Sequence, residues 1–119
     1  MVIRKFEDLI AWQKAQDLVV LIYRIYKNCK DYNFKNQICS AGISISNNIA
    51  EGFDRSSDAD FSRFLYIALS SASEVKSMSY LAFRLEYISD KEKEDLLLAG
   101  NEVSKIIRGL LKSLYKNKL

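Results

Sequence analysis

Apolar side chains recur along most of the chain at intervals of three and four residues, the spacing of an amphipathic α-helix. The pattern predicts a first helix over residues 6–26, with an apolar face of Leu9, Trp12, Ala15, either Leu18 or Val19, Ile22 and Ile25. A second helix is predicted over residues 34–52, with Ile38, either Ala41 or Gly42, Ile45 and Ile49 on one face. A short alternation over residues 42–46 resembles a strand. It is brief and has no partner strand elsewhere, so a helix is the preferred interpretation.

The third and fourth helices have the clearest beginnings. Ser57 followed by Asp60, and Ser89 followed by Glu92, match the capping box, in which two side chains satisfy N–H groups of the first helical turn. These caps predict helices over residues 57–87 and 89–115. The third helix carries a seven-residue apolar repeat, typical of a long bundle helix: Phe61, Leu65, Ala68, Ala72, Val75, Ser79 and Ala82. The apolar face of the fourth helix is Leu96, Val103, Ile107, Leu110 and Leu114.

Four long helices with short connections predict an all-α fold, an up-down antiparallel four-helix bundle. The length of 119 residues fits a single domain, residues 1–119. The chain has no proline, so few breaks are forced on its helices. Gly52 is expected to cap the end of the second helix. Gly100, inside the fourth, indicates a close helix crossing.

Several classes of chemistry lack their usual residues. The sequence has no histidine, which removes the commonest general base and metal ligand. Cys29 and Cys39 do not have the spacing of a zinc site, and no glycine-rich phosphate loop or nucleophile elbow is present. We therefore expect no catalytic, cofactor-binding or metal-binding residue, and we do not expect an enzyme. No segment has the length and apolarity of a membrane span or signal peptide, so a cytoplasmic protein with reduced thiols is expected.

The stretch SISNNIAEGFDR, residues 44–55, places polar side chains beside the apolar face of the second helix. The predicted polar network consists of Ser44, Asn47, Asn48, Glu51 and Arg55, with Arg63 from the next helix. A carboxylate near a helix C-terminus is disfavoured by the helix dipole, so it needs a cation or a hydrogen-bond donor. The preferred interpretation is a structural network that fixes helix register or caps the turn into the third helix. A contact with another subunit or with a ligand is the alternative.

The C-terminal helix carries the positive surplus of the chain. After Val103 there are five basic residues and no acidic residue. Four of them, spaced three, four and four, form a basic stripe: Lys105, Arg108, Lys112 and Lys116. A solvated helical face explains such a stripe in most proteins. The alternative is a nucleic-acid-binding surface, because clustered cations gain from the release of counterions, and Tyr115 could stack on a base.

The third helix has more apolar positions than one seam requires, namely Phe64, Met78, Leu81 and Leu85. A second apolar face on a helix usually needs a second partner. A homo-oligomer is therefore expected. Trp12 fits either the core or a subunit interface, and the core is preferred.

The motifs FEDLIAWQKA from Phe6, SISNNIAEG from Ser44 with Arg55 behind it, and FSRFLYIALSSASEV from Phe61 resemble the bacterial 23S rRNA intervening-sequence protein family. The resemblance runs from Phe6 to about Leu114. The chain departs from the family pattern at Ser46, where proline or alanine is frequent, and at Ser70, where glycine is frequent. Neither change threatens the fold.

The resemblance implies an antiparallel bundle that assembles into a homo-oligomer, a pentameric ring, with no established catalytic activity. A related group, the accessory proteins of diversity-generating retroelements, forms basic rings that bind nucleic acid and a reverse transcriptase. Partners implied for this chain are RNA or DNA, and a reverse transcriptase or another protein. Two function classes follow: a nucleic-acid-binding or nucleoprotein scaffold that uses the basic stripe, and a structural oligomer or protein-interaction module with no nucleic-acid ligand.

Overall fold

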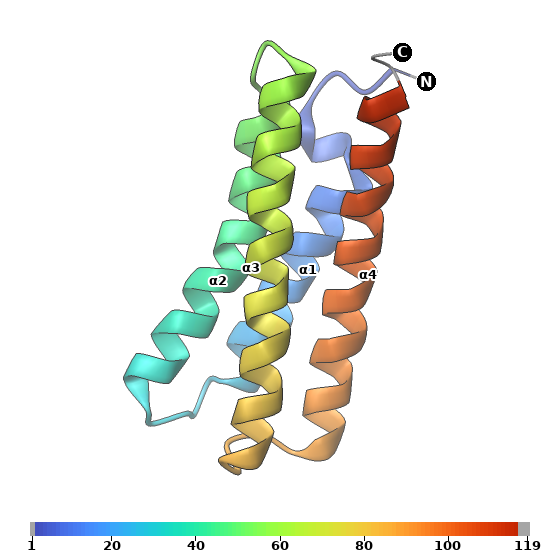
Figure 1. Cartoon of the computed structure of the whole chain (residues 1–119). Coiled ribbons are helices and arrows are strands. Elements are labelled where there is room, and N and C mark those ends of the chain that lie inside the picture. Colours follow the sequence, from blue (N-terminus) through green and yellow to red (C-terminus); the bar gives the residue numbers. More distant parts are fainter. Residues whose placement is uncertain (1, 117–119) are drawn as a thin grey trace.

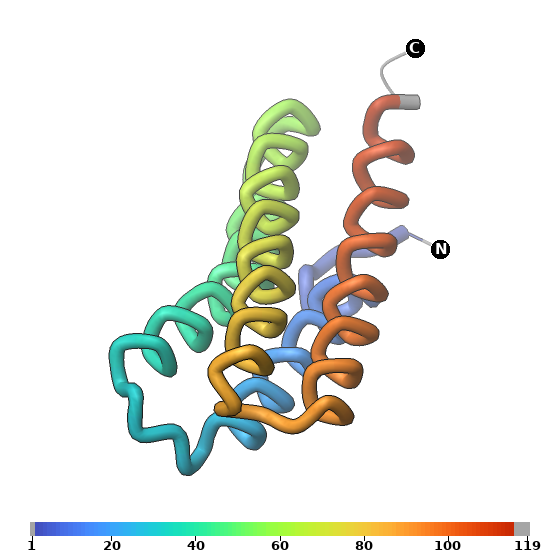
Figure 2. Tube along the Cα trace, turned by 60° about the horizontal axis from the view of Figure 1, so that its bottom comes forward, coloured from blue at the N-terminus to red at the C-terminus, as the bar shows by residue number. Residues whose placement is uncertain are grey.

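The computed structural model describes residues 2–116, with the side chain of Lys116 outside the description. It contains a 3-10 turn, η1 (Phe6–Asp8), and four helices: α1 (Ile10–Ile25), α2 (Tyr32–Phe53), α3 (Asp58–Arg84) and α4 (Asp90–Lys116). The helices run alternately up and down in an elongated bundle of 48 × 22 × 19 Å (Figure 1). Each packs against its neighbours in sequence, and α1 also packs against α4 (Figure 2). The predicted all-α four-helix bundle is confirmed.

The first helix begins later than the sequence predicts. Residues 6–8 form a 3-10 turn, and Leu9 after them is extended, so α1 starts at Ile10. The ring of Phe6 packs edge-on against Trp12, with centroids 5.3 Å apart, which holds the turn against α1. The side chain of Gln13 donates a hydrogen bond to the carbonyl of Glu7, which fixes the same turn. Trp12 is partly buried and packs against the core, the preferred of its two interpretations.

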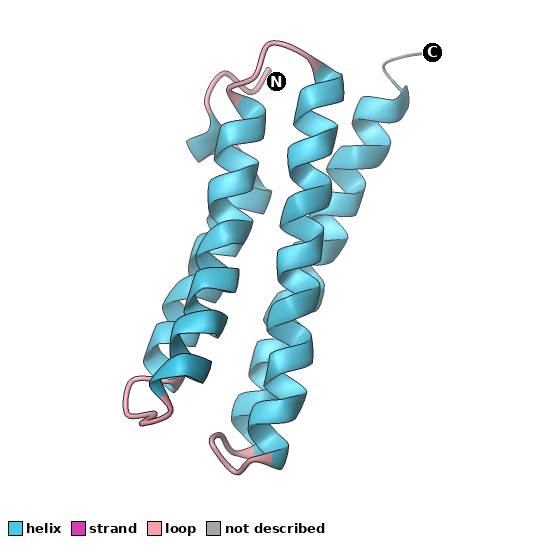
Figure 3. Cartoon of the chain, turned by 60° about the vertical axis from the view of Figure 1, so that its left-hand side comes forward, coloured by secondary structure: helices cyan, strands magenta, loops and turns pink. Residues whose placement is uncertain are grey.

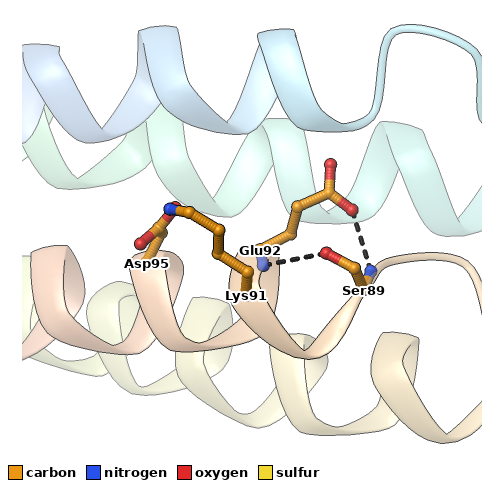
Figure 4. A network of polar contacts seen from close by, with 4 residues as sticks. All are labelled: Ser89, Lys91, Glu92 and Asp95. Atoms are coloured by element: carbon orange, nitrogen blue, oxygen red, sulfur yellow. Dashed lines mark hydrogen bonds and ion pairs between the residues drawn. The ribbon is translucent and has the colours of Figure 1, made fainter.

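Serine caps are present at both predicted helix starts, but among the described residues the reciprocal capping box forms at Ser89 and not at Ser57. Ser57 accepts from the N–H of Asp60 at 3.1 Å. Ser89 and Glu92 form the reciprocal pair: Ser89 Oγ accepts from the Glu92 N–H, and the Glu92 carboxylate accepts from the Ser89 N–H at 2.8 Å (Figure 4). Each bond satisfies an amide that has no partner within its own helix.

A third cap, at Asp31, also links the α1–α2 connection to the α3–α4 connection. Its carboxylate accepts from the N–H of Phe34, so α2 starts two residues before the predicted bound. The Tyr87 hydroxyl donates to the same carboxylate at 2.7 Å. These two hydrogen bonds, with that of Tyr87 the stronger influence, lower the pKa of Asp31. The α1–α2 and α3–α4 connections lie at the same end of the bundle (Figure 3), so this contact joins the two helical hairpins.

The end of α3 is set by the backbone. Glu86 has φ = 64°, the left-handed region, which ends the helix at Arg84 rather than at the predicted residue 87. Tyr87 then donates its N–H to the carbonyl of Ala82, which closes the turn before α4.

The core lies where the four apolar faces meet. Every residue of the predicted seam of α3 is buried. The role predicted for Gly52 is wrong. It does not cap α2, because the helix continues through Phe53 and no glycine of residues 2–116 has a positive φ. A Cβ at Gly52 would lie 2.6 Å from Phe64 Cβ, so glycine is there because α2 and α3 approach closely.

The second apolar face of α3 divides into two parts. Phe64 and Met78 are buried within the chain itself. Leu81 and Leu85 remain 46% and 45% exposed. Ile67, which is also exposed, and Leu81 lie seven residues either side of Glu74, whose side chain bonds to Gln37 of α2, so this apolar face is on the α2 side of α3.

Candidate functional site

The basic stripe lies on an exposed face of α4. Lys105, Arg108 and Lys112 are all exposed, and their spacing of three and four places them on one side of the helix. Among the described side chains, the ion pairs join Lys14 to Glu102, Lys91 to Asp95, and Lys93 to Asp90 and Glu94. None of these pairs includes a cation of the stripe. The predicted Lys116 has its side chain outside the described part of the chain.

Two members of the stripe help to line a groove of about 430 Å³ between α3 and α4. Its lining is Tyr66, Leu69, Arg108, Leu111, Lys112 and Tyr115. The tyrosine side chains are largely exposed, 62% for Tyr66 and 69% for Tyr115, whereas Leu69 and Leu111 are partly buried against the core. The helices run side by side here (Figures 1 and 2), so aromatic rings from two helices stand next to two cations.

Tyr66 is the groove residue that the sequence reasoning missed. It lies on α3, outside both the apolar seam and the basic stripe, and its relevance follows only from the packing of α3 against α4. The signal in the sequence was an aromatic residue on the third helix that lies outside its seven-residue apolar repeat. That signal does not by itself say which helix lies beside it.

Part of the predicted polar stretch forms a cluster between α2 and α3. The side-chain amide of Asn48 donates to the Ser44 carbonyl at 2.8 Å and to the Ser44 hydroxyl at 3.0 Å. Ser71 on α3 donates to the same hydroxyl at 2.8 Å. A second bond between these helices runs from Gln37 to Glu74 at 3.2 Å. The cluster links the two helices through short side chains that let them pack closely.

Other members of that predicted network lie apart from it. Asn47 and Glu51 are exposed, and within residues 2–116 neither has a side-chain hydrogen bond or ion pair. Arg55 and Arg63 lie over the ring of Phe64, at 4.9 and 4.6 Å from its centroid. Both guanidinium groups are therefore drawn to an aromatic face rather than to the carboxylate. Within one chain, Ser44 and Asn48 come together with Ser71, while the role of the whole set stays a prediction.

The described residues offer little for catalysis. They contain no group of three or more side chains able to hold a metal ion. Cys39 is buried, and burial raises the pKa of its thiol, which disfavours the nucleophilic thiolate. Burial likewise raises the pKa of Tyr26, whose hydroxyl has no hydrogen-bond partner in the described structure.

None of the described helices combines the length and apolarity that a membrane crossing requires.

The fold and the α4 surface define a small all-helical bundle with a basic, partly aromatic outer face. The chain belongs to the 23S rRNA-intervening sequence protein family, whose model matches residues 7–109. The resemblance read from the sequence is thereby confirmed.

The chain is also similar to a solved structure from Bacteroides thetaiotaomicron VPI-5482, a protein with unknown function from the S23 ribosomal protein family. The two are 31% identical with a TM-score of 0.82, and the match covers 87% of this chain and 99% of that one. No curated protein matches the chain. Neither the family nor the similar structure gives evidence of catalysis. The oligomer, the pentameric ring, and the nucleic-acid and reverse-transcriptase partners stay predictions.

Proposed function

We propose that this chain is a non-enzymatic nucleic-acid-binding scaffold whose α4 surface contacts the phosphate backbone. The observation that carries the proposal is the set of exposed cations Lys105, Arg108 and Lys112, none of which pairs with a carboxylate among the described residues. Cations already neutralised within a protein gain little from a phosphate. Cations without such partners can neutralise phosphates and release the counterions condensed on them.

Three phosphate contacts on one subunit give weak binding, and an oligomer would strengthen it. If subunits assemble into a ring, the same three cations repeat around it, and later contacts form at a high effective concentration. RNA is the first ligand to test, because the family name refers to 23S rRNA and the similar structure is assigned to a ribosomal protein family.

A binding assay with a charge-matched control tests this proposal. Fluorescence anisotropy would be measured with structured RNA, duplex DNA and single strands between about 50 and 200 mM salt. The variant Lys105→Gln/Arg108→Gln/Lys112→Gln should weaken binding to every sequence. Its plot of log affinity against log salt should be flatter by about 2 to 3 in slope. The variant Arg24→Gln/Lys27→Gln/Lys30→Gln removes the same charge from exposed side chains at the opposite end of the bundle.

The control should retain most of the wild-type affinity. Equal losses in the two triple variants would mean that net charge alone, and not the α4 surface, attracts the ligand. No binding of any probe at micromolar protein and low salt would refute the proposal.

A second candidate is a structural oligomer or protein-interaction module, favoured by the exposed Ile67, Leu81 and Leu85 on the α2 side of α3. Apolar side chains grouped on one helix face are typical of an interface. Leu81→Gln/Leu85→Gln should reduce the mass measured by light scattering while the far-ultraviolet circular dichroism stays helical. A wild-type protein with the mass of one subunit would contradict the oligomer in both candidates.

A further inference from the structure

The groove between α3 and α4 combines features that a phosphate-binding surface alone does not need. Arg108 and Lys112 supply positive charge, and Tyr66 and Tyr115 supply two exposed aromatic rings from different helices. We propose that the groove binds unpaired nucleotides, whose bases stack on Tyr66 and Tyr115 while Arg108 and Lys112 contact the adjacent phosphates. This inference rests on the proposed nucleic-acid function and adds the kind of strand that is bound.

The physical reason is the accessibility of base faces. In a duplex the bases stack on one another, so a surface groove meets phosphates and sugars. In a single strand each base can leave its neighbours and place a face against an aromatic ring, whatever its identity. The groove volume of about 430 Å³ falls in the range of sites for small organic ligands, about 300–1,000 Å³. It therefore suits a single nucleotide rather than a nucleic-acid duplex.

The apolar residues of the groove support the same assignment. Leu69 and Leu111 are partly buried against the core, so they form the apolar floor of the groove, and the rings and cations are more exposed. Arg108 can also contribute by stacking its planar guanidinium on a base, which lysine cannot do. The lining contains no acidic side chain that would repel a phosphate.

The opposite end of the α3–α4 pair provides a contrast. Tyr80 and Phe83 lie there with Lys93, whose ammonium is 4.4 Å from the Phe83 ring centroid. That lysine is neutralised by Asp90 at 3.1 Å and by Glu94 at 3.4 Å. The Tyr66 groove instead places two rings beside two cations that have no carboxylate partner among the described residues. A hollow at the α1–α2 connection also has lysines that are unpaired within residues 2–116, Lys27, Lys30 and Lys35, but it contains one ring, that of Tyr32.

The test separates stacking from charge. Anisotropy would be measured with a labelled oligouridine of about 12 nucleotides and a duplex of the same length. Tyr66→Leu/Tyr115→Leu retains apolar side chains but removes the rings. Single-strand affinity should fall about 10- to 100-fold, with duplex affinity and the salt slope unchanged. Tyr32→Leu, at a tyrosine that is 66% exposed at the other end of the bundle, should bind like the wild type.

A second variant keeps the test decisive if the leucine substitutions disturb folding. Tyr66→Trp/Tyr115→Trp retains stacking rings at both positions, so it should keep or increase single-strand affinity. Circular dichroism and light scattering would be recorded for each variant.

Each outcome separates this inference from the proposed function. Equal affinity for single strand and duplex, unaffected by loss of the rings, would overturn the inference and leave the α4 phosphate surface standing. A leucine variant with a reduced oligomer mass would assign the groove to a second copy of the chain and also overturn it. Absence of binding to every probe would refute both proposals.

Discussion

Replacing Gly52 by alanine should destabilise the bundle, although alanine is the better helix former. The added Cβ would lie 2.6 Å from Phe64 Cβ and 3.0 Å from Phe61 Cδ1. Carbon atoms pack favourably at roughly 3.5–4.0 Å, so the gap must widen by about 1 Å. Phe64 Cβ is bonded directly to the α3 backbone and cannot rotate away. The two helices would have to separate along the interface that also holds the Ser44–Ser71 hydrogen bond.

The expected size follows from two opposing terms. Overpacking of this kind costs about 1–3 kcal/mol, and the helix propensity of alanine returns up to about 1 kcal/mol. For 119 residues the entropy of unfolding is roughly 0.25 kcal/mol/K, so each kcal/mol moves Tm by about 4 °C. A net loss of about 1–2 kcal/mol should therefore lower Tm by roughly 4–8 °C.

Gly109→Ala is the matched control, because a Cβ there meets no heavy atom within 4 Å. It should raise Tm by about 2–4 °C through helix propensity alone. Gly42→Ala should lie between the two, since its Cβ would meet Ile22 Cδ1 at 2.7 Å, an atom at the end of a side chain that can shift without moving the backbone. Thermal melts followed by circular dichroism would measure all three variants. A Gly52→Ala protein as stable as Gly109→Ala would refute the close-approach reasoning.

Four further predictions concern the polar side chains. Ser89→Ala removes the cap of α4 and should cost about 1 kcal/mol in denaturant unfolding, whereas the exposed Ser113→Ala should cost nothing or stabilise slightly. Tyr87→Phe removes the bond that lowers the pKa of Asp31. The variant should have a lower Tm than the wild type at neutral pH. This difference in Tm should shrink as the pH falls below 3.8, the ordinary pKa of Asp31, and vanish in stronger acid, where Asp31 is protonated. A difference that persists in strong acid would contradict the assignment. Asn48→Ala should lower Tm by a few degrees because two hydrogen bonds to Ser44 are lost. Glu51→Gln should leave the Tm of a monomer within about 2 °C, so a larger shift or a changed mass would place Glu51 at a subunit contact.

The architecture could be predicted because each helix carries its own local signals. Spaced apolar residues and the serine caps at Ser57 and Ser89 act within one turn or one face, so neighbouring chain is enough to recognise them. The start of α1 was misplaced because its 3-10 turn is held by Phe6 against Trp12, a contact that competes with continued helix. Over three residues a 3-10 turn and an α-helix give nearly the same apolar spacing, so the sequence pattern does not distinguish them.

The candidate site was predictable only on the α4 side. Arg108 and Lys112 follow from charge spacing along one helix, whereas Tyr66 enters through the packing of α3 beside α4. The same limit applies to Gly52, because neighbouring residues do not indicate how closely Phe64 approaches it. Arg55 was matched to Glu51 by charge and spacing, but the Phe64 ring that it lies over becomes available only when α2 and α3 meet.

The order in which helices pack also bears on how quickly the chain can fold. Three of the four helix–helix interfaces join sequence neighbours: α1 with α2, α2 with α3, and α3 with α4. The fourth, between α1 and α4, joins helices from the two ends of the chain. Such low contact order is associated with folding in microseconds to milliseconds. The absence of proline removes cis–trans isomerisation as a slow step. Stopped-flow refolding should therefore show a fast phase whose rate does not depend on protein concentration. A slower phase that quickens with protein concentration would indicate the predicted association of subunits.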